Sequence, residues 1–214
     1  MKIALAQLNY CIGDFDGNTG KIISSALKAK AEGADIVVFS ELSICGYFPS
    51  DCLLFDDFQK KCQASLNQIA EKCFDVPVIV GCPMPNENEG QKPLQNCAVY
   101  LYQGKRQIFA KQRIGSNPLC DERPYFEPSA DNEILEFEGF RIAVTLGDDL
   151  SNWSDDPILI ENRMDQLIGK HPNLVVNLAA SPFDYTMPKK RLDLLRLTAL
   201  KHELPLVFVN QVGA

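Results

Sequence analysis

The chain has 214 residues, of which 46% are hydrophobic and 23% charged, a balance typical of one globular domain with a sizeable core. Its formal net charge of −7 argues against a nucleic-acid-binding surface, which needs clustered lysine and arginine. The sequence has no apolar run long enough to cross a membrane and no secretory signal at its start, so we expect a cytoplasmic protein without membrane contact.

The eight cysteines are spread singly along the chain, and none forms a CxxC pair. Zinc sites usually show closely spaced ligand pairs, and the chain has only His171 and His202 as histidines. We therefore expect no metal site. In a reducing compartment several of these thiols are expected to pack as small hydrophobic groups.

Strand and helix patterns alternate along the chain. The first half is expected to contain a strand within residues 1–9, a helix capped by Asn18 and running to Ala31 before Gly33, a buried strand at 35–40, a loop at 45–51, a helix at 57–73 and a strand at 76–81. The second half is expected to contain hairpins at 98–110 and 134–146, a helix at 158–168, a strand at 173–178, a helix at 190–202 and a strand at 206–210. Strands separated by helices and interrupted by hairpins predict a layered α/β fold with mixed sheets.

Residues 1–214 form a single expected domain, without internal repeats, linkers or low-complexity segments. The sequence stops directly after its last predicted strand, with no closing helix. We therefore expect this domain to be the N-terminal part of a longer polypeptide.

Three predicted strands end in residues that suit catalysis, because loops held by a rigid sheet commonly carry catalytic groups. The first strand leads to Glu41, the second to Lys111 and the third to Gly147. Taken singly, Glu41 and Lys111 are more simply explained as solvated side chains, and Gly147 as a turn residue. Their order along the chain is what favours a site.

Glutamate, then lysine, then a sharp strand-to-turn elbow resembles the nitrilase superfamily, whose catalytic set is Glu, Lys and Cys in that order. The likeness covers nearly the whole chain and is most specific to the glutaminase domain of glutamine-dependent NAD synthetases. The segments that carry it are residues 3–9, 12–14, 17–18, 33–42, 45–47, 51, 53–54, 121–122, 125–126, 177, 180–183 and 209–213.

The resemblance implies a nitrilase-type α-β-β-α sandwich, with two mixed sheets between layers of helices. It also implies cleavage of an amide C–N bond by a cysteine thiolate, through a thioester that water then hydrolyses. Glu41 matches the general base, and Lys111 matches the cation that stabilises the oxyanion. Glu122 matches an additional acid that holds the site geometry, and the implied substrate contacts are Tyr47, Asp148 and Ser181.

The pattern breaks at the nucleophile, because Gly147 stands where the family carries cysteine. Cys120 falls where relatives have an aromatic residue and is expected to be a packing residue. Cys45 lies close to Glu41 in sequence, but to act as the nucleophile it would need to cross the pocket in the wrong orientation. The segments 113–119 and 184–188 also depart from the family pattern, so constraint on this pocket is expected to be relaxed.

Three functional hypotheses follow from these residues. The first is a glutaminase-like domain whose hydrolytic chemistry is impaired or lost. The second is an active carbon-nitrogen hydrolase acting on another amide, with a different nucleophile or with water activated directly by Glu41. The third is a binding or structural module that holds glutamine or a similar amino acid without turnover.

The resemblance also implies partners. In working relatives the ammonia released from glutamine passes to a C-terminal synthetase domain that amidates an adenylated nicotinate dinucleotide. We expect no cofactor for residues 1–214 themselves; ATP and Mg²⁺ would belong to such a synthetase domain, if one follows. The expected ligand is a small glutamine-like amide, and the expected assembly is a homo-oligomer.

Overall fold

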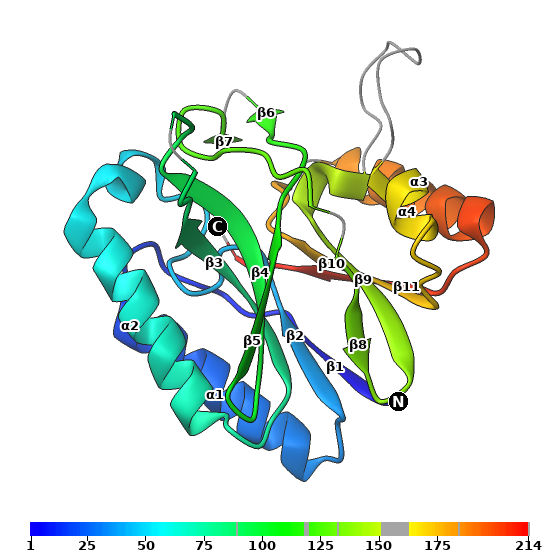
Figure 1. Ribbon diagram of the computed structural model, residues 1–214, viewed down its shortest axis with the longest axis horizontal. Helices are drawn as coiled ribbons and strands as arrows, with labels where there is room; N and C mark the ends of the chain where they lie inside the picture. The colour runs from blue at the N-terminus through cyan, green and yellow to red at the C-terminus, as the bar shows by residue number, and fades with distance from the viewer. Residues whose placement is uncertain (89, 118–119, 132, 151–162, 184, 214) are drawn as a thin grey trace.

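The computed structural model describes residues 1–88, 90–117, 120–131, 133–150, 163–183 and 185–213. Figure 1 shows the two larger sheets packed between layers of helices. This is the predicted α-β-β-α sandwich, which is therefore confirmed.

The first sheet of the described residues has five strands in the order β1-β2-β3-β4-β5. The three strands β1, β2 and β3 are parallel, whereas β4 and β5 pair antiparallel, so the sheet is mixed as predicted. Its strands are β1 (Ile3–Ala6), β2 (Ile36–Phe39), β3 (Val78–Pro85), β4 (Leu94–Tyr102) and β5 (Lys105–Ala110).

The second sheet of the described residues has four strands in the order β11-β10-β9-β8. It is also mixed, because β9, β10 and β11 are parallel and β8 pairs antiparallel with β9. Its strands are β8 (Leu135–Phe137), β9 (Phe140–Leu146), β10 (Leu174–Ala179) and β11 (Leu206–Asn210).

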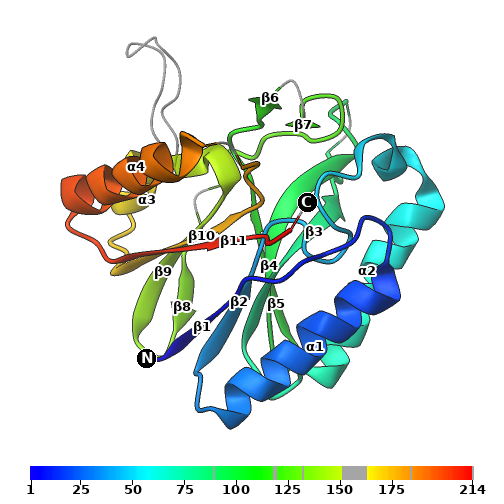
Figure 2. The ribbon, with the colours of Figure 1, turned by 180° about the vertical axis from the view of Figure 1, so that it is seen from behind.

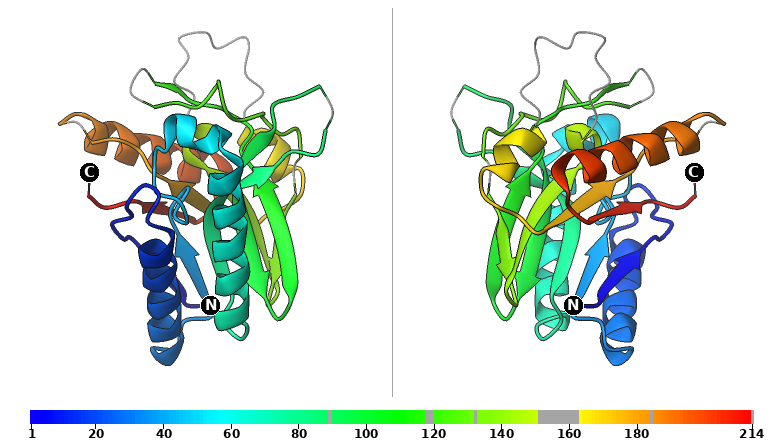
Figure 3. Two further views of the ribbon diagram at one scale, coloured as in Figure 1. Left: turned by 90° about the vertical axis from the view of Figure 1, so that its left-hand side faces the viewer. Right: turned by 90° about the vertical axis from the view of Figure 1, so that its right-hand side faces the viewer.

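The helices cover the outer faces of the sheets, as Figures 2 and 3 show from behind and from the sides. The pair beside the first sheet is α1 (Phe15–Ala31) and α2 (Asp56–Lys72). The pair beside the second sheet is α3 (Arg163–Ile168) and α4 (Met187–His202).

Strand β2 shows why this sandwich holds together. Val38 packs into the core between the two sheets, whereas its neighbour Phe39 packs against the helix side, because successive side chains of a strand point to opposite faces. Both side chains are fully buried. A strand covered on both faces is apolar throughout, which explains the unbroken run Ile36–Phe39.

The start of α1 differs from the prediction. Asp14 is the N-cap, and its side chain accepts a hydrogen bond of 3.0 Å from the backbone N–H of Gly17. Asn18 lies inside the helix and is fully buried; it bonds to the backbone N–H and C=O of Cys11 and to the C=O of Ile44. The predicted cap was wrong because a buried Asn can satisfy the backbone of neighbouring loops instead of its own helix.

Other segments are more structured than the sequence indicated. Ser50–Leu54 and Gly147–Leu150 form short 3₁₀ helices, and β6 (Ser116–Asn117) pairs with β7 (Cys120–Asp121). Residues 158–162 of the helix predicted at 158–168 lie outside the described residues. Within the described ranges, no helix has the length and apolar character needed to span a bilayer.

Candidate functional site

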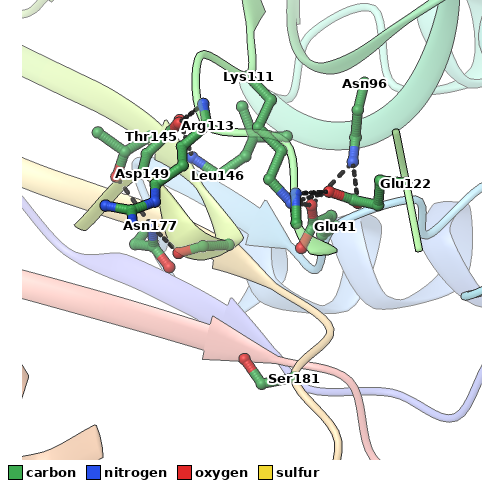
Figure 4. Close-up of polar contacts among 12 residues, drawn as sticks. Glu41, Asn96, Lys111, Arg113, Glu122, Thr145, Leu146, Asp149, Asn177 and Ser181 are labelled. Carbon is green, nitrogen blue, oxygen red and sulfur yellow. Dashed lines mark hydrogen bonds and ion pairs between the residues drawn. The ribbon is translucent and has the colours of Figure 1, made fainter. Parts of the chain in front are cut away.

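The two sheets bring the three predicted strand ends together. Glu41 follows β2 and Lys111 follows β5, both in the first sheet, whereas Gly147 follows β9 in the second. Strands β4 and β5 contact β9 across the interface, so the carboxylate, the amine and the elbow converge. Figure 4 shows the resulting cluster.

Lys111 lies between two carboxylates. Its Nζ donates to Glu41 Oε1 at 2.7 Å and to Glu122 Oε2 at 2.6 Å. The three side chains are only 1–3% exposed, so this is a buried triad rather than a set of solvated surface residues. Such a triad tolerates burial because each charge has an opposite partner and further hydrogen bonds.

Asn96 in β4 completes the cluster, and the sequence did not single it out. Its Nδ2 donates to Glu41 Oε1 at 2.8 Å and to Glu122 Oε1 at 3.0 Å (Figure 4). The side chain is fully buried. A fully buried asparagine near the start of a largely apolar strand is the signal that sequence reading can use for such a residue.

Burial sets the electrostatics of the cluster. Desolvation raises the pKa of Glu41 from its ordinary value of 4.5 to about 7; the Lys111 charge opposes this shift and the Glu122 charge adds to it. Burial by itself lowers the pKa of Lys111, but the adjacent Glu41 and Glu122 carboxylates raise it well above its ordinary value. The amine is therefore a fixed cation, and Glu41 is a carboxylate that exchanges protons near neutral pH.

Gly147 faces this cluster. A β-carbon at residue 147 would lie 2.8 Å from Glu41 Oε2 and 2.8 Å from Lys111 Nζ. Its φ of +42° belongs to the left-handed region that favours glycine. Any side chain at this position would point directly at the carboxylate and the amine.

Asp149 ties the elbow to the lysine loop and was not identified from the sequence. Its Oδ1 accepts from the backbone N–H groups of Gln112 and Arg113 at 3.0 and 2.8 Å, and its Oδ2 accepts from Leu146 N–H at 2.9 Å. Because Gln112 follows Lys111 and Leu146 precedes Gly147, this one buried carboxylate fixes the spacing of the two loops.

Asn177 supports the elbow from β10. Its Nδ2 donates to Thr145 Oγ1 at 3.0 Å and to the Gly147 carbonyl at 3.4 Å. Asn177 is one of the residues that carry the family resemblance, and its contacts show that it supports the backbone of the elbow.

A cavity of about 80 Å³ opens beside Glu41, Lys111 and Gly147. The predicted substrate contacts Tyr47, Asp148 and Ser181 all line it. A larger hollow of about 650 Å³ adjoins it and shares Tyr47 and Ser181.

Cys120 and Cys45 lie close in sequence to Glu122 and Glu41. Cys120 lines both hollows, so the prediction of a packing residue was incomplete. Burial and the Glu122 carboxylate raise the pKa of its thiol, which disfavours the thiolate needed for attack. Cys45 is fully buried in the core between the first sheet and its helices, away from the cavity.

The chain matches known proteins over almost its whole length. Residues 2–214 match the family model of the carbon-nitrogen hydrolases. The chain is 39% identical over 220 residues to the glutamine-dependent NAD(+) synthetase of Synechocystis sp., which covers 99% of this chain and 39% of the relative. It is 30% identical over 213 residues to the glutamine-dependent NAD(+) synthetase of Acinetobacter baylyi. That match covers 99% of this chain and 37% of the relative.

Solved structures show the same fold. The ADP complex of glutamine-dependent NAD+ synthetase from Acinetobacter baumannii superposes with a TM-score of 0.89 at 31% identity, over 99% of this chain and 38% of that one. A nitrilase-superfamily amidase from Nesterenkonia superposes with a TM-score of 0.83 at 21% identity. The superposition covers 100% of this chain and 77% of the amidase.

The chain spans 39% or less of the length of the synthetases reported above. The match nevertheless covers almost every residue of this chain, including the Glu41 and Lys111 strand ends. The chain belongs to the carbon-nitrogen hydrolase family, as a nitrilase-type, glutaminase-like domain related to glutamine-dependent NAD synthetases.

Proposed function

We propose that this domain descends from an ammonia-supplying glutaminase, keeps the amide-binding cavity and has lost the covalent step of hydrolysis. One observation carries the proposal: the β-carbon direction of residue 147 points at Glu41 and Lys111, yet the residue is glycine. The position where a nucleophile would meet its base and its cation therefore holds no sulfur or oxygen.

The remaining groups have the chemistry of a base and an oxyanion site. A nucleophile at residue 147 would lose its proton to Glu41, whose pKa of about 7 suits proton transfer at neutral pH. Lys111 would stabilise the negative charge that develops on the amide oxygen, and Glu122 would hold Lys111 in place. Without a nucleophile these groups bind and polarise an amide but form no thioester.

The wider context is also a proposal. The synthetases that the chain resembles are longer, which supports a C-terminal synthetase domain as its partner. ATP and Mg²⁺ would then act in that synthetase domain, and NAD synthesis there would draw on free ammonia. The whole protein would be a cytoplasmic homo-oligomer. The present domain would serve as an interface or ligand-binding part.

The test is ammonia release from glutamine by this chain and by Gly147→Cys, with Gly147→Ala as the matched control that adds a β-carbon without a thiol. We expect release only from the cysteine variant, at least about a thousandfold above the other two, because interdependent catalytic groups fail together. In both variants the added β-carbon meets the ends of the Glu41 and Lys111 side chains at 2.8 Å and residue 147 must adopt a φ of +42°, so Gly147→Ala also controls for this strain. Comparable release by the unchanged chain would instead establish another nucleophile or direct attack by water.

A second candidate function is ligand binding without turnover, favoured by the cavity lined by Tyr47, Asp148 and Ser181. Titration calorimetry of the unchanged chain with glutamine separates this function from a purely structural one. Saturable heat with the unchanged chain supports binding; no heat rejects it.

A further inference from the structure

The two carboxylates of the cluster are engaged differently. Within the described residues, Glu41 accepts hydrogen bonds only through Oε1, from Asn96 Nδ2 at 2.8 Å and Lys111 Nζ at 2.7 Å. Its Oε2 is the oxygen nearer to the position that a β-carbon of residue 147 would take. The distance to that position is 2.8 Å from Oε2 and 3.2 Å from Oε1. One oxygen is therefore held and the other is presented to the position of the nucleophile.

Both oxygens of Glu122 are occupied. Oε1 accepts from Asn96 Nδ2 at 3.0 Å, and Oε2 accepts from Lys111 Nζ at 2.6 Å and from Gly115 N–H at 3.0 Å. This carboxylate has no free oxygen aimed at residue 147. The hydrogen bonds thus assign Glu122 to holding the cluster and leave Glu41 for proton transfer.

Asn96 is the group that creates this difference, because it donates one amide hydrogen to each carboxylate. Reversing the amide would place its oxygen against two carboxylate oxygens, so its orientation is dictated by the acids. This orientation leaves Asn96 Oδ1 buried without a hydrogen-bond partner among the described residues. A second cation at this point would also bind both acids, but its charge would suppress the basicity of Glu41.

We propose that Asn96 is a positioning residue that clamps Oε1 of Glu41, so that Oε2 faces residue 147 as the basic atom, and that holds Glu122 away from this role. The proposal rests on the proposed function, because it deepens the role of Glu41 at the same site. Asn96 touches neither the substrate cavity nor residue 147, so it acts through the carboxylates.

The proposal predicts how Glu41 titrates when Asn96 is changed. The charged and titratable groups that face Glu41 are Lys111, Glu122, Asp148, Tyr47 and Cys120. All of them stay in place in Asn96→Leu, which removes both donors at similar volume. Loss of a hydrogen bond to the ionised form favours the protonated form, so the Glu41 midpoint moves upward.

The first experiment uses the chain with Gly147 intact and follows carboxyl groups by infrared or ¹³C NMR titration, with Glu41→Gln to assign the signal. We expect Asn96→Leu to raise the midpoint of Glu41 by about one pH unit, a tenfold gain in proton affinity. Asn96→Ser, which keeps one hydroxyl donor, is expected to give a smaller rise and guards against misfolding of the leucine variant.

Asn18→Leu is the matched control, since Asn18 is equally buried but bonds only to backbone groups of Cys11 and Ile44 among the described residues. It is expected to lower stability without moving the Glu41 midpoint. An unchanged midpoint in both Asn96 variants, or an equal shift in Asn18→Leu, overturns the proposal.

The second experiment measures glutamine hydrolysis in the Gly147→Cys background. Asn96→Leu is expected to lower kcat about 10- to 100-fold with KM changed less than about threefold, and to move the acid limb of the pH profile upward. An unchanged limb and kcat overturn the proposal. If Gly147→Cys itself is inactive, the proposed function fails, while the titration still decides the role of Asn96.

Discussion

The two sheets contribute unequally to the cavity. The first sheet supplies the charged half: Glu41 and Lys111 at strand ends and Asn96 within β4, joined by hydrogen bonds of 2.7 and 2.8 Å. The second sheet supplies the elbow half, where Gly147 has no side chain and Asn177 bonds to the backbone and to a hydroxyl.

The difference shows that chemistry and stability are separable in this site. Removing the Lys111 cation leaves the buried Glu41 and Glu122 carboxylates unpaired, which is strongly destabilising. A glycine at the elbow occupies a φ of +42° at little strain and leaves no charge unpaired. Glycine at the elbow therefore leaves the charged half in place, whereas removal of its cation does not.

Breaking the charged half tests this contrast most severely. Lys111→Met leaves Glu41 and Glu122 buried without their cation, and we expect a loss of about 3–5 kcal/mol in the free energy of unfolding at pH 8. Urea denaturation measures it. Lys201→Met is the matched control: its ion pair with Asp165 has side chains 58% and 53% exposed and is worth less than about 1 kcal/mol. Equal losses of unfolding free energy in Lys111→Met and Lys201→Met would show that the buried cluster contributes no more to stability than an exposed ion pair.

The pH dependence of stability sharpens the comparison. Because the pKa of Glu41 is about 7 in the folded chain and 4.5 ordinarily, the folded state binds more protons between these values. Its contribution to stability therefore decreases as pH rises from about 4.5 to about 7, by about 3 kcal/mol in total. Glu41→Gln lacks this slope, so its stability relative to the parent should rise across the interval. Parallel pH curves from urea titrations would show that Glu41 is not a perturbed acid.

The smallest effect is expected where the two halves are joined. Asp149→Asn keeps the shape of the side chain but replaces one carboxylate oxygen with an NH₂ group. The hydrogen bond from either Leu146 N–H or the N–H groups of the lysine loop is then lost, because an NH₂ group cannot accept it. We expect a loss of about 2 kcal/mol, typical of hydrogen bonds to a charged group. Thermal unfolding measures it.

Asp121→Asn is the control for this change, since Asp121 is paired with the exposed Arg123 and should tolerate the substitution with little change. In the Gly147→Cys background, Asp149→Asn should also reduce kcat because the spacing of Lys111 and residue 147 loosens. A stable and fully active Asp149→Asn variant would show that this carboxylate does not set the spacing.

Much of the fold was predictable because burial leaves a periodic trace in the sequence. The apolar run at Ile36–Phe39 indicated a strand covered on both faces, and the alternation with helices indicated layers. The start of α1 was not predictable, because Asp14 and Asn18 both suit a cap and only the contacts of Asn18 with Cys11 and Ile44 decide between them.

The site divides in the same way. Strand ends and family order indicated Glu41, Lys111 and the elbow at Gly147, because a strand delivers the residue after it to the edge of the sheet. Asn96 and Asp149 were missed, because Asn96 acts through Glu41 and Glu122, 55 and 26 residues away in sequence, and Asp149 binds the lysine loop 36 and 37 residues away. Such partners become neighbours only when the sheets pack.

The sequence by itself determined the layers, the lineage and the absence of a thiol at residue 147, since these depend on residue types and their local spacing. Only the tertiary structure decided that residue 147 faces Glu41 Oε2 and Lys111 Nζ, and that Asn96 makes the two carboxylates different. The physical reason is that hydrogen-bond direction and desolvation depend on which distant strands are packed together, and these set the proton affinity of Glu41.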